Sequence, residues 1–250
     1  MGANFMKKLA FGAVAAAMVA CLGSAQAGVI TFDEPINSPF APFAPFFGDG
    51  DEFYQSDFWL QPFSNAAEAQ PGDLVGAVVD GSDPFACSTM LCPTGNASNY
   101  YASLNDGVLA LGHLGGNFFR VNGFDASFLG NGVGALPAVA GLLRLQGIRA
   151  NGTSITQTYL LDGPDANGNL GFDSYLTTGA FRTTNLVMLF AFGFACNELG
   201  TCNAFTTNRG QFALDNLDVS VIPEPASLAL ATLSLGLMGA VHRRRRVVAA

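Results

Sequence analysis

The sequence predicts an all-β protein, a jelly-roll-like antiparallel β-sandwich. Short segments with alternating or continuous apolar residues recur through residues 28–222, and Gly, Asn and Pro lie between them. No segment in this range has the 3.6-residue apolar period of an amphipathic helix. Many short strands joined by such turns are typical of a sandwich. The helices that we expect lie at the two ends, a signal-peptide helix and a C-terminal hydrophobic helix.

Residues 1–27 have the composition of a secretory signal peptide. Lys7 and Lys8 form a basic start, residues 9–22 are apolar and uncharged, and Ala25-Gln26-Ala27 is a small-x-small cleavage site. We therefore expect cleavage after Ala27. The alternative is a lipoprotein signal that ends at Cys21.

The first part of the exported chain predicts few regular elements. Residues 29–33 alternate and are rich in β-branched side chains, which predicts a strand. Residues 39–47 contain a threefold Pro-Phe repeat, whose prolines exclude a helix or a central strand. We favour a loop with its phenylalanines tucked into the core over an exposed adhesive segment, because exposed phenylalanine clusters promote aggregation. Residues 48–107 predict weak strands joined by long loops.

Two hairpins are predicted in the middle of the chain. Gly115-Gly116 separates the apolar runs 108–114 and 117–124. Asn151-Gly152, the preferred pair of a type I′ turn, separates the runs 142–150 and 153–161. Counting outward from the second turn sets the expected pairs, which are Ile148 with Ile155, Gln146 with Gln157, Arg144 with Tyr159 and Leu142 with Leu161.

The last two apolar segments predict long strands. Residues 186–195 are a continuous apolar run that could be a buried helix, but the alternation Phe190-x-Phe192-x-Phe194 favours a central strand of the sandwich. Residues 211–221 predict a final strand whose apolar phase shifts at Asp215-Asn216, and such a shift indicates a β-bulge. This final strand resembles the last strand of jelly-roll domains, including carbohydrate-binding modules.

Four cysteines remain after signal-peptide removal, and an even number in an oxidising compartment suggests two disulfides. Three connectivities are possible. The spacing favours Cys87–Cys92 and Cys196–Cys202, each closing a short polar loop. A zinc site is the alternative, but the C-x4-C and C-x5-C spacings are loose for zinc.

The charge of the exported part excludes one class of partner. The chain has 11 Lys and Arg, six of which lie in the two terminal segments, so five arginines remain against 19 acidic residues. With Glu224 of the tail counted among the acidic residues, the exported part has a formal charge of about −14, which repels phosphate backbones. We expect no nucleic-acid binding.

The exported part has few residues suited to catalysis. Its sole histidine, His113, lies in an apolar strand pattern, and no Gly-x-Ser-x-Gly or His-Glu-x-x-His motif is present. Its glutamates are few, and none lies in a strand context that would raise its pKa. We therefore expect no catalytic residues and no enzyme activity, with a secreted hydrolase as the distant alternative.

Two segments suggest ligands. Aromatic rings that stack and amides that bind hydroxyls are the residue types of a sugar site. The candidate rings are Trp59, Tyr54, Tyr100, Tyr101 and Tyr175, and we favour the group of Tyr100 and Tyr101 beside Asn96 and Asn99. Ordinary core or rim aromatics are the alternative for each of them. The loop 162–169 offers oxygen atoms for calcium. Its candidate ligands are Asp162, Asp165 and Asn167. An ordinary Asp/Asn/Gly turn is the interpretation that we favour for this loop, so we expect no resident cofactor.

The tail, residues 223–246, has three parts. Two prolines around a glutamate cannot continue a strand, residues 226–241 are uncharged and apolar, and four arginines follow. At 1.5 Å per residue the apolar run spans about 24 Å, slightly short of a bilayer core of about 30 Å. The basic cluster is typical of the cytoplasmic side.

This tail resembles the PEP-CTERM sorting signal of Gram-negative bacteria. The matching residues are Pro223, Glu224, Pro225, Arg243, Arg244, Arg245 and Arg246, with the apolar run between them. The resemblance implies three partners: the secretion machinery, an exosortase that removes the tail, and the inner membrane as a transient anchor. It also implies delivery to the cell surface or the extracellular matrix, and a link with exopolysaccharide and biofilm. We therefore expect a structural surface protein, with a carbohydrate-binding module as the alternative.

Overall fold

A computed structural model describes residues 26–36, 38–66, 68–83, 85–87, 90–132 and 135–223. Residues 1–25 of the expected signal peptide, the alternative lipoprotein cysteine and the tail beyond Pro223 lie outside these residues, and so do the two expected terminal helices. The last two residues of the expected signal peptide, Gln26 and Ala27, are described and begin the first strand. Within the described ranges no helix is both long enough and apolar enough to cross a membrane.

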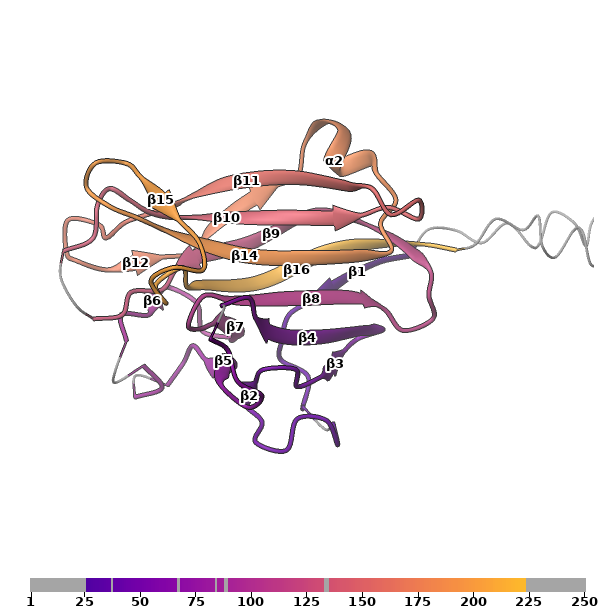
Figure 1. The fold of residues 1–250 in the computed structure, drawn as a ribbon, viewed down its shortest axis with the longest axis horizontal. Helices are drawn as coiled ribbons and strands as arrows, with labels where there is room; N and C mark the ends of the chain where they lie inside the picture. Colours follow the sequence, from indigo (N-terminus) through magenta and orange to yellow (C-terminus); the bar gives the residue numbers. More distant parts are fainter. Residues whose placement is uncertain are drawn as a thin grey trace, which may run out of the picture. The chain divides into compact units, whose positions relative to one another are not determined.

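Residues Gln26–Val221 form one compact unit built from two antiparallel sheets, which confirms the predicted β-sandwich (Figure 1). Sheet A has the strand order β13-β9-β16-β7-β5-β2, with β1 beside β16. Its strands are β1 (Gln26–Ile30), β2 (Phe46–Gly48), β5 (Leu74–Asp80), β7 (Asn99–Ser103), β9 (Phe118–Phe128), β13 (Asp173–Leu176) and β16 (Phe212–Ile222).

Sheet B has the order β11-β10-β14-β8-β4-β3, with β15 beside β14. Its strands are β3 (Phe53–Gln55), β4 (Phe58–Ser64), β8 (Gly107–His113), β10 (Val139–Ile148), β11 (Ser154–Asp162), β14 (Met188–Cys196) and β15 (Cys202–Asn203). A small parallel pair, β6 (Pro93–Thr94) with β12 (Leu170–Gly171), and the helix α2 (Gly179–Thr183) complete the described elements.

The main core lies between the two sheets and is rich in aromatic rings. Successive residues of a strand point to opposite faces, so alternate side chains of each strand enter this core. Its largest fully buried members include Phe32, Phe47, Phe53, Tyr101, Phe119 and Phe212. A second, smaller core on the other face of sheet A contains Ala77, Val79, Tyr100, Ala102, Leu104, Leu129 and Ala213.

The predicted hairpin at Gly115-Gly116 is wrong, although a turn is present there. The His113 carbonyl accepts a hydrogen bond from Gly116 N–H (2.9 Å). However, β8 belongs to sheet B and β9 to sheet A, so the turn connects the two layers. Leu111 and Val121 both enter the main core. Two strands that pack face to face in different sheets have the same apolar sequence pattern as two strands that pair edge to edge in one sheet.

The β10–β11 hairpin forms, but its register differs by one residue from the prediction. Ile148 pairs with Ser154, and Arg144 pairs with Thr158. The loop has three residues, because Arg149 N–H donates to the Thr153 carbonyl (2.9 Å). Within this loop only Gly152 has a positive φ, of 79°, whereas a type I′ turn needs a positive φ at Asn151 as well.

The predicted bulge in the last strand agrees with the structure. Asn216 has a positive φ of 48°. Phe212 and Leu214 before it, and Leu217 and Val219 after it, all enter the main core, so the apolar phase shifts by one residue.

The Pro-Phe repeat differs from the favoured prediction, because Phe40, Phe43 and Phe46 are 60%, 77% and 56% exposed. In successive turns, Ala41 N–H donates a hydrogen bond to the Ser38 carbonyl, and Ala44 N–H donates one to the Ala41 carbonyl. These turns direct the alanines, and not the phenylalanines, toward the core. Only the last ring of the repeat, Phe47, is fully buried.

Burial of four tyrosines predicts a loss of stability at alkaline pH. Burial raises the pKa of Tyr100 to about 12 and raises the pKa of Tyr101, Tyr159 and Tyr175 further. Unfolded tyrosines ionise near pH 10, so the unfolded state binds fewer protons above that pH and the free energy of unfolding falls. The chain's lysines, Lys7 and Lys8, both lie in the expected signal peptide. We expect urea unfolding midpoints to fall between pH 9 and 11, and to fall less in Tyr100→Phe; a midpoint that is constant over this range would contradict the argument.

Candidate functional site

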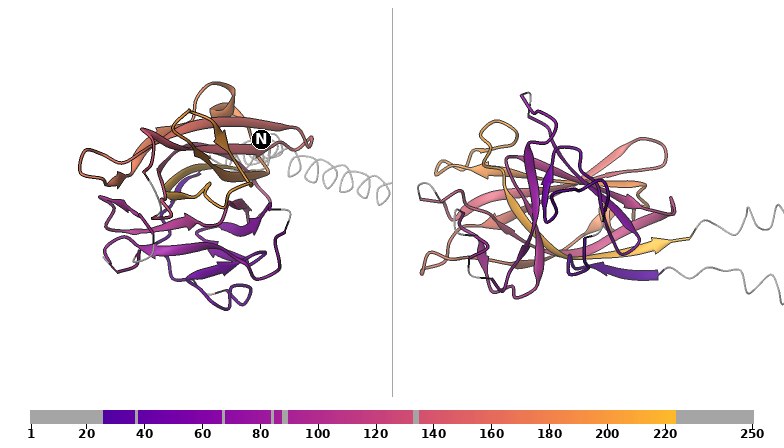
Figure 2. Two further views of the ribbon diagram at one scale, coloured as in Figure 1. Left: turned by 60° about the vertical axis from the view of Figure 1, so that its left-hand side comes forward. Right: turned by 90° about the horizontal axis from the view of Figure 1, so that it is seen from below.

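The last strand ends where the tail begins. β16 extends to Ile222, and Pro223 follows it directly. β1 pairs with this end of β16, since Gln26 lies opposite Val221 and Gly28 opposite Val219. Figure 2 shows the two strands side by side. The expected cleavage position after Ala27 therefore lies next to the strand that leads into Pro223; the rest of the sorting motif, Glu224 onward, is outside the described residues.

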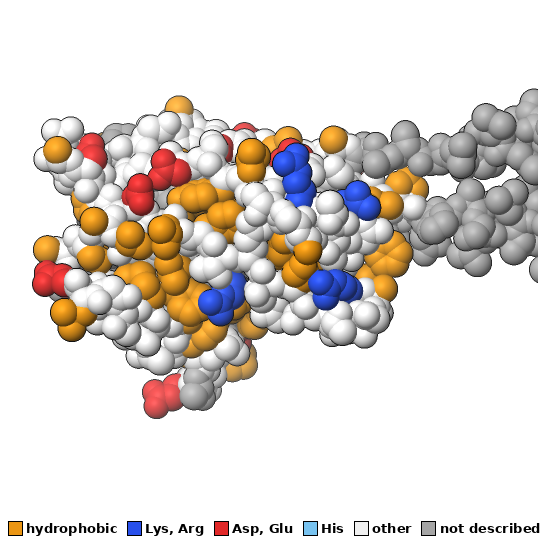
Figure 3. All heavy atoms as spheres, turned by 90° about the horizontal axis from the view of Figure 1, so that it is seen from above, with side chains coloured by type: hydrophobic (Ala, Val, Ile, Leu, Met, Phe, Trp, Pro, Cys, Tyr) orange, Lys and Arg blue, Asp and Glu red, His pale blue; other side chains and the backbone are white. Residues whose placement is uncertain are grey.

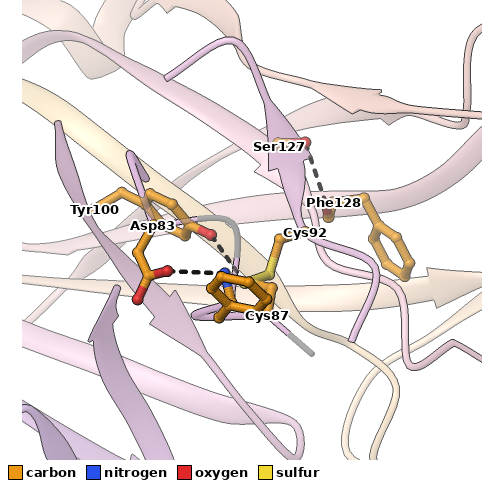
Figure 4. Close-up of a disulfide and its surroundings, with 7 residues drawn as sticks. Asp83, Cys87, Cys92, Tyr100, Ser127 and Phe128 are labelled. Atoms are coloured by element: carbon orange, nitrogen blue, oxygen red, sulfur yellow. Dashed lines mark hydrogen bonds between the residues drawn. A yellow bond between two sulfur atoms is a disulfide. The ribbon is translucent and has the colours of Figure 1, made fainter. Parts of the chain in front are cut away.

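Both predicted disulfides are present, Cys87–Cys92 and Cys196–Cys202. The first closes a loop over the smaller core on sheet A, where Cys87 Sγ lies 3.6 Å from Tyr100 Oη (Figure 4). The Phe172 ring packs edge-on against the Tyr100 ring at 5.3 Å between centroids. The loop is therefore a cover that keeps water from Tyr100.

The structure does not support a sugar site at Tyr100 and Tyr101, which are 1% and 0% exposed. The two side chains point to opposite faces of β7, and both faces are covered. Asn96 Nδ2 donates to Asp215 Oδ2 (2.7 Å), and Asn99 N–H donates to Asp33 Oδ1 (2.9 Å). The side-chain amide of Asn96 thus takes part in a hydrogen bond within the fold, whereas the Asn99 bond is made by its backbone. Neither tyrosine ring has a free face for a sugar.

Asp215 is the centre of a buried polar network. Its carboxylate also accepts hydrogen bonds from Ser98 Oγ (3.1 Å) and Asn216 N–H (2.7 Å). Burial raises the pKa of Asp215, and the hydrogen bonds from Asn96, Asn216 and Ser98 oppose that rise. The network holds the bulge of β16 against the loop that precedes β7.

The calcium candidates form a turn. Asp165 Oδ1 accepts hydrogen bonds from Asn167 N–H (2.8 Å) and Asn169 N–H (2.9 Å), and these bonds lower the pKa of Asp165. Asp162 is the last residue of β11 and is exposed. The described part of the chain contains no group of three or more His, Cys, Asp or Glu side chains that could hold a metal ion.

His113 lies at the end of β8 in a local structural role. Its Nδ1 accepts a hydrogen bond from Gly115 N–H (3.0 Å), and its ring packs edge-on against Phe58 at 5.4 Å. The first contact belongs to the turn between the sheets, and the second joins the neighbouring strands β8 and β4 of sheet B.

An aromatic surface lies on the outer face of sheet B; the sequence indicates Trp59 as a candidate for sugar stacking but not the phenylalanines that accompany it. Leu189 and Ala191 of β14 enter the core, so Phe190, Phe192 and Phe194 point outward and are half-buried. Phe58 and Leu60 of β4 enter the core in the same way. We call the outward set the aromatic face; its members are Trp59, Phe63, Phe190, Phe192 and Phe194. The alternation of β14 was a correct signal for a central strand, but alternation does not say which side of the sheet is covered.

The rings of the aromatic face contact one another across strand β8. Trp59 lies directly over Gly112, where a Cβ atom would come within 2.6 Å of Trp59 Cζ2. The Phe63 and Phe190 centroids are 6.1 Å apart, and those of Phe192 and Phe194 are 5.7 Å apart. The face thus holds two pairs of rings in contact, with Trp59 beside them over Gly112.

Two further side chains border these rings. The Phe205 ring lies 5.4 Å from Phe192, and the Arg144 guanidinium lies 4.7 Å above the Phe194 ring. On the side of the molecule seen in Figure 3, hydrophobic side chains gather in a broad area beside basic ones, and acidic side chains lie mainly toward the left.

Comparison with known proteins matches the tail. Residues 221–246 match the PEP-CTERM protein-sorting motif. No curated protein matches the chain.

Solved structures with a similar course of the chain are β-rich and distant in sequence. The α-L-arabinofuranosidase MgGH51 has a TM-score of 0.39 and 10% identity over 80% of this chain and 27% of its own. TmCBM61, solved with β-1,4-galactotriose, has a TM-score of 0.31 and 12% identity over 75% of this chain and 100% of its own. The CBM22-1 xylan-binding domain of Paenibacillus barcinonensis Xyn10C has a TM-score of 0.33 and 7% identity over 81% and 100%. Likeness at this level assigns no ligand to this chain.

The cover over Tyr100 predicts unequal effects of removing the two disulfides. Both close loops of similar size, so the loss of loop closure costs about 2 kcal/mol in each case. We expect Cys87→Ser with Cys92→Ser to lower the free energy of unfolding more than Cys196→Ser with Cys202→Ser, because the first loop also covers the smaller core. Urea unfolding of the two double variants measures this difference, and equal losses would show that the loop is not a cover.

Proposed function

From the PEP-CTERM protein-sorting motif that this chain carries at residues 221–246, we propose that it is an exported protein sorted by an exosortase to the cell surface or extracellular matrix. The observation that carries the proposal is the position of the motif. Pro223 follows the last strand of the sandwich without a linker, and the part of β1 that remains after cleavage at Ala27 holds that strand as far as Val219. The folded domain therefore ends immediately before the segment to be cut.

The three parts of the tail have separate roles in this proposal. The Pro-Glu-Pro segment presents an extended backbone without strand partners, because proline lacks a backbone donor. The apolar run 226–241 holds this segment at the outer boundary of the inner membrane, and Arg243–Arg246 stay on the cytoplasmic side. Cleavage by the exosortase then releases the domain from its transient anchor.

We further propose that the domain has a structural role in an exopolysaccharide or biofilm matrix, without enzyme activity and without a resident cofactor. Its sole histidine is engaged at a turn, and the buried carboxylate of Asp215 is engaged with Asn96 and Ser98. Carbohydrate binding is the second candidate function. Tyr100 and Tyr101 do not supply its site, whereas the aromatic face has the residue types that it needs.

Glu224→Ala tests the sorting proposal in the native host. We expect loss of tail removal and accumulation of a membrane-bound form, because the charged residue between the two prolines distinguishes this segment from other proline-containing joints. Glu198→Ala is the matched control, since Glu198 is an exposed glutamate in a loop of the sandwich. Mass spectrometry of the mature protein measures the C-terminal residue, the N-terminal residue and any lipid together.

The proposal predicts normal processing of the control and a retained tail in Glu224→Ala. A mature protein of unchanged mass, released in unchanged amount from the Glu224→Ala strain, would refute exosortase sorting through this motif.

A further inference from the structure

We propose that the aromatic face of sheet B binds a neutral polysaccharide, which lies over strands β4, β8 and β14 and runs along them. The inference rests on the second candidate function, carbohydrate binding, and does not depend on the sorting proposal. It rests on the arrangement of rings, amides and charges on one face of one sheet.

The rings form a platform because the strand between them carries small side chains. On β8 the outward residues are Val108, Ala110 and Gly112, and all three are buried beneath their neighbours. Trp59 covers Gly112, and any larger residue there would push the indole away from the sheet. One side of the Trp59 ring therefore lies against the backbone of β8, and the residue is half-buried. A ring held in this way can stack on the C–H face of a sugar ring.

The second property is a row of side chains with an amide at each end. Across the sheet, Gln61 lies opposite Ala110, Ala110 opposite Phe190, and Phe190 opposite Gln146. Gln61 is held in place by a hydrogen bond from its Nε2 to the Gly50 carbonyl (3.3 Å). Amides both donate and accept hydrogen bonds, so they suit the hydroxyl groups at the rim of a sugar whose face is stacked on a ring.

Neighbouring rows repeat the pattern of rings. Phe63 lies opposite Val108, and Val108 opposite Phe192, one step of two residues further along each strand. Side chains two residues apart on a strand are separated by about 6.6 Å. Successive rows therefore offer several rings to successive sugars of one chain, as binding of a polymer requires.

The charge of the face selects a neutral ligand. The outward-facing positions of β4, β8, β10 and β14 include no Asp or Glu, although the exported part has 19 acidic residues and five arginines. At the β3 edge of the face, Tyr54 lies opposite Trp59 and its hydroxyl donates to Glu52 Oε1 (2.6 Å). The carboxylate that borders the rings is therefore already hydrogen-bonded, and these four strands offer a cationic polymer no series of carboxylates. The sole cation on these strands, Arg144, is stacked on Phe194 at one end, so an extended anionic polymer would find no matching series of charges.

The test uses Trp59, the only tryptophan of the chain, as a probe within the site. The mature exported protein is titrated with neutral oligosaccharides of β-glucan, galactan, xylan and mannan, and with alginate as an acidic polymer. We expect saturable changes in tryptophan emission with at least one neutral glycan and none with alginate.

Variants locate the binding site by calorimetry with the glycan that binds. Trp59→Ala and Phe190→Ala are expected to weaken binding at least about tenfold each, because rings at the centre of a contact dominate its free energy. Gln61→Ala is expected to weaken binding without removing a ring. Phe85→Ala, which removes an aromatic side chain that is 80% exposed and lies outside sheet B, is the matched control and should bind as the parent does. Thermal unfolding establishes which variants are folded.

Two results would overturn the proposal. The first is that no neutral glycan changes the emission of Trp59 or releases heat on titration. The second is that sedimentation shows a dimer that Trp59→Ala dissociates, which would mean that a second copy of this chain covers the face. Neither result affects processing of the tail, so a failure here is distinct from a failure of the sorting proposal.

Discussion

The sandwich depends on the bend of its last strand at Asp215-Asn216. Before the bend β16 pairs with β7, and after it β16 pairs with β1, while its apolar side chains stay in the core on both sides. Such a bend places a carboxylate inside the protein, which is unfavourable unless hydrogen bonds satisfy it. Asn96, Ser98 and the backbone of Asn216 supply them. The segment before β7 is polar because this bend needs it.

This constraint explains where prediction from the sequence succeeded and where it failed. The phase shift of β16 and the alternation of β14 were readable, because periodicity follows directly from strand geometry. Periodicity does not say what covers a face. Phe190, Phe192 and Phe194 therefore looked like core residues although they point outward, and Tyr100 looked like a surface residue although the Cys87–Cys92 loop covers it. These contacts are set by segments distant in sequence.

The same limit applies to the connections between strands. The register of β10 and β11 depends on whether Asn151 adopts a positive φ, which is a choice between two turns that the same residues allow. The disulfide pairing was predictable, because short spacings leave few alternatives. The sandwich class was predictable as well, but the aromatic face required knowledge of which strands are neighbours.

The pairing of β1 with β16 has a consequence for the order of folding. The first strand of the unit can pair only after the last strand has been made, so the domain has contacts between residues that are very far apart in sequence. Chains with such contacts fold slowly. In a chain that crosses a membrane N-terminus first, the position between β9 and β7 in sheet A is unoccupied until β16 has crossed. The unfinished sheets would expose open edges during that interval. A chaperone on the far side of the membrane would have to protect these edges longest at this stage. Cutting of the tail before β16 has paired would release an incomplete domain.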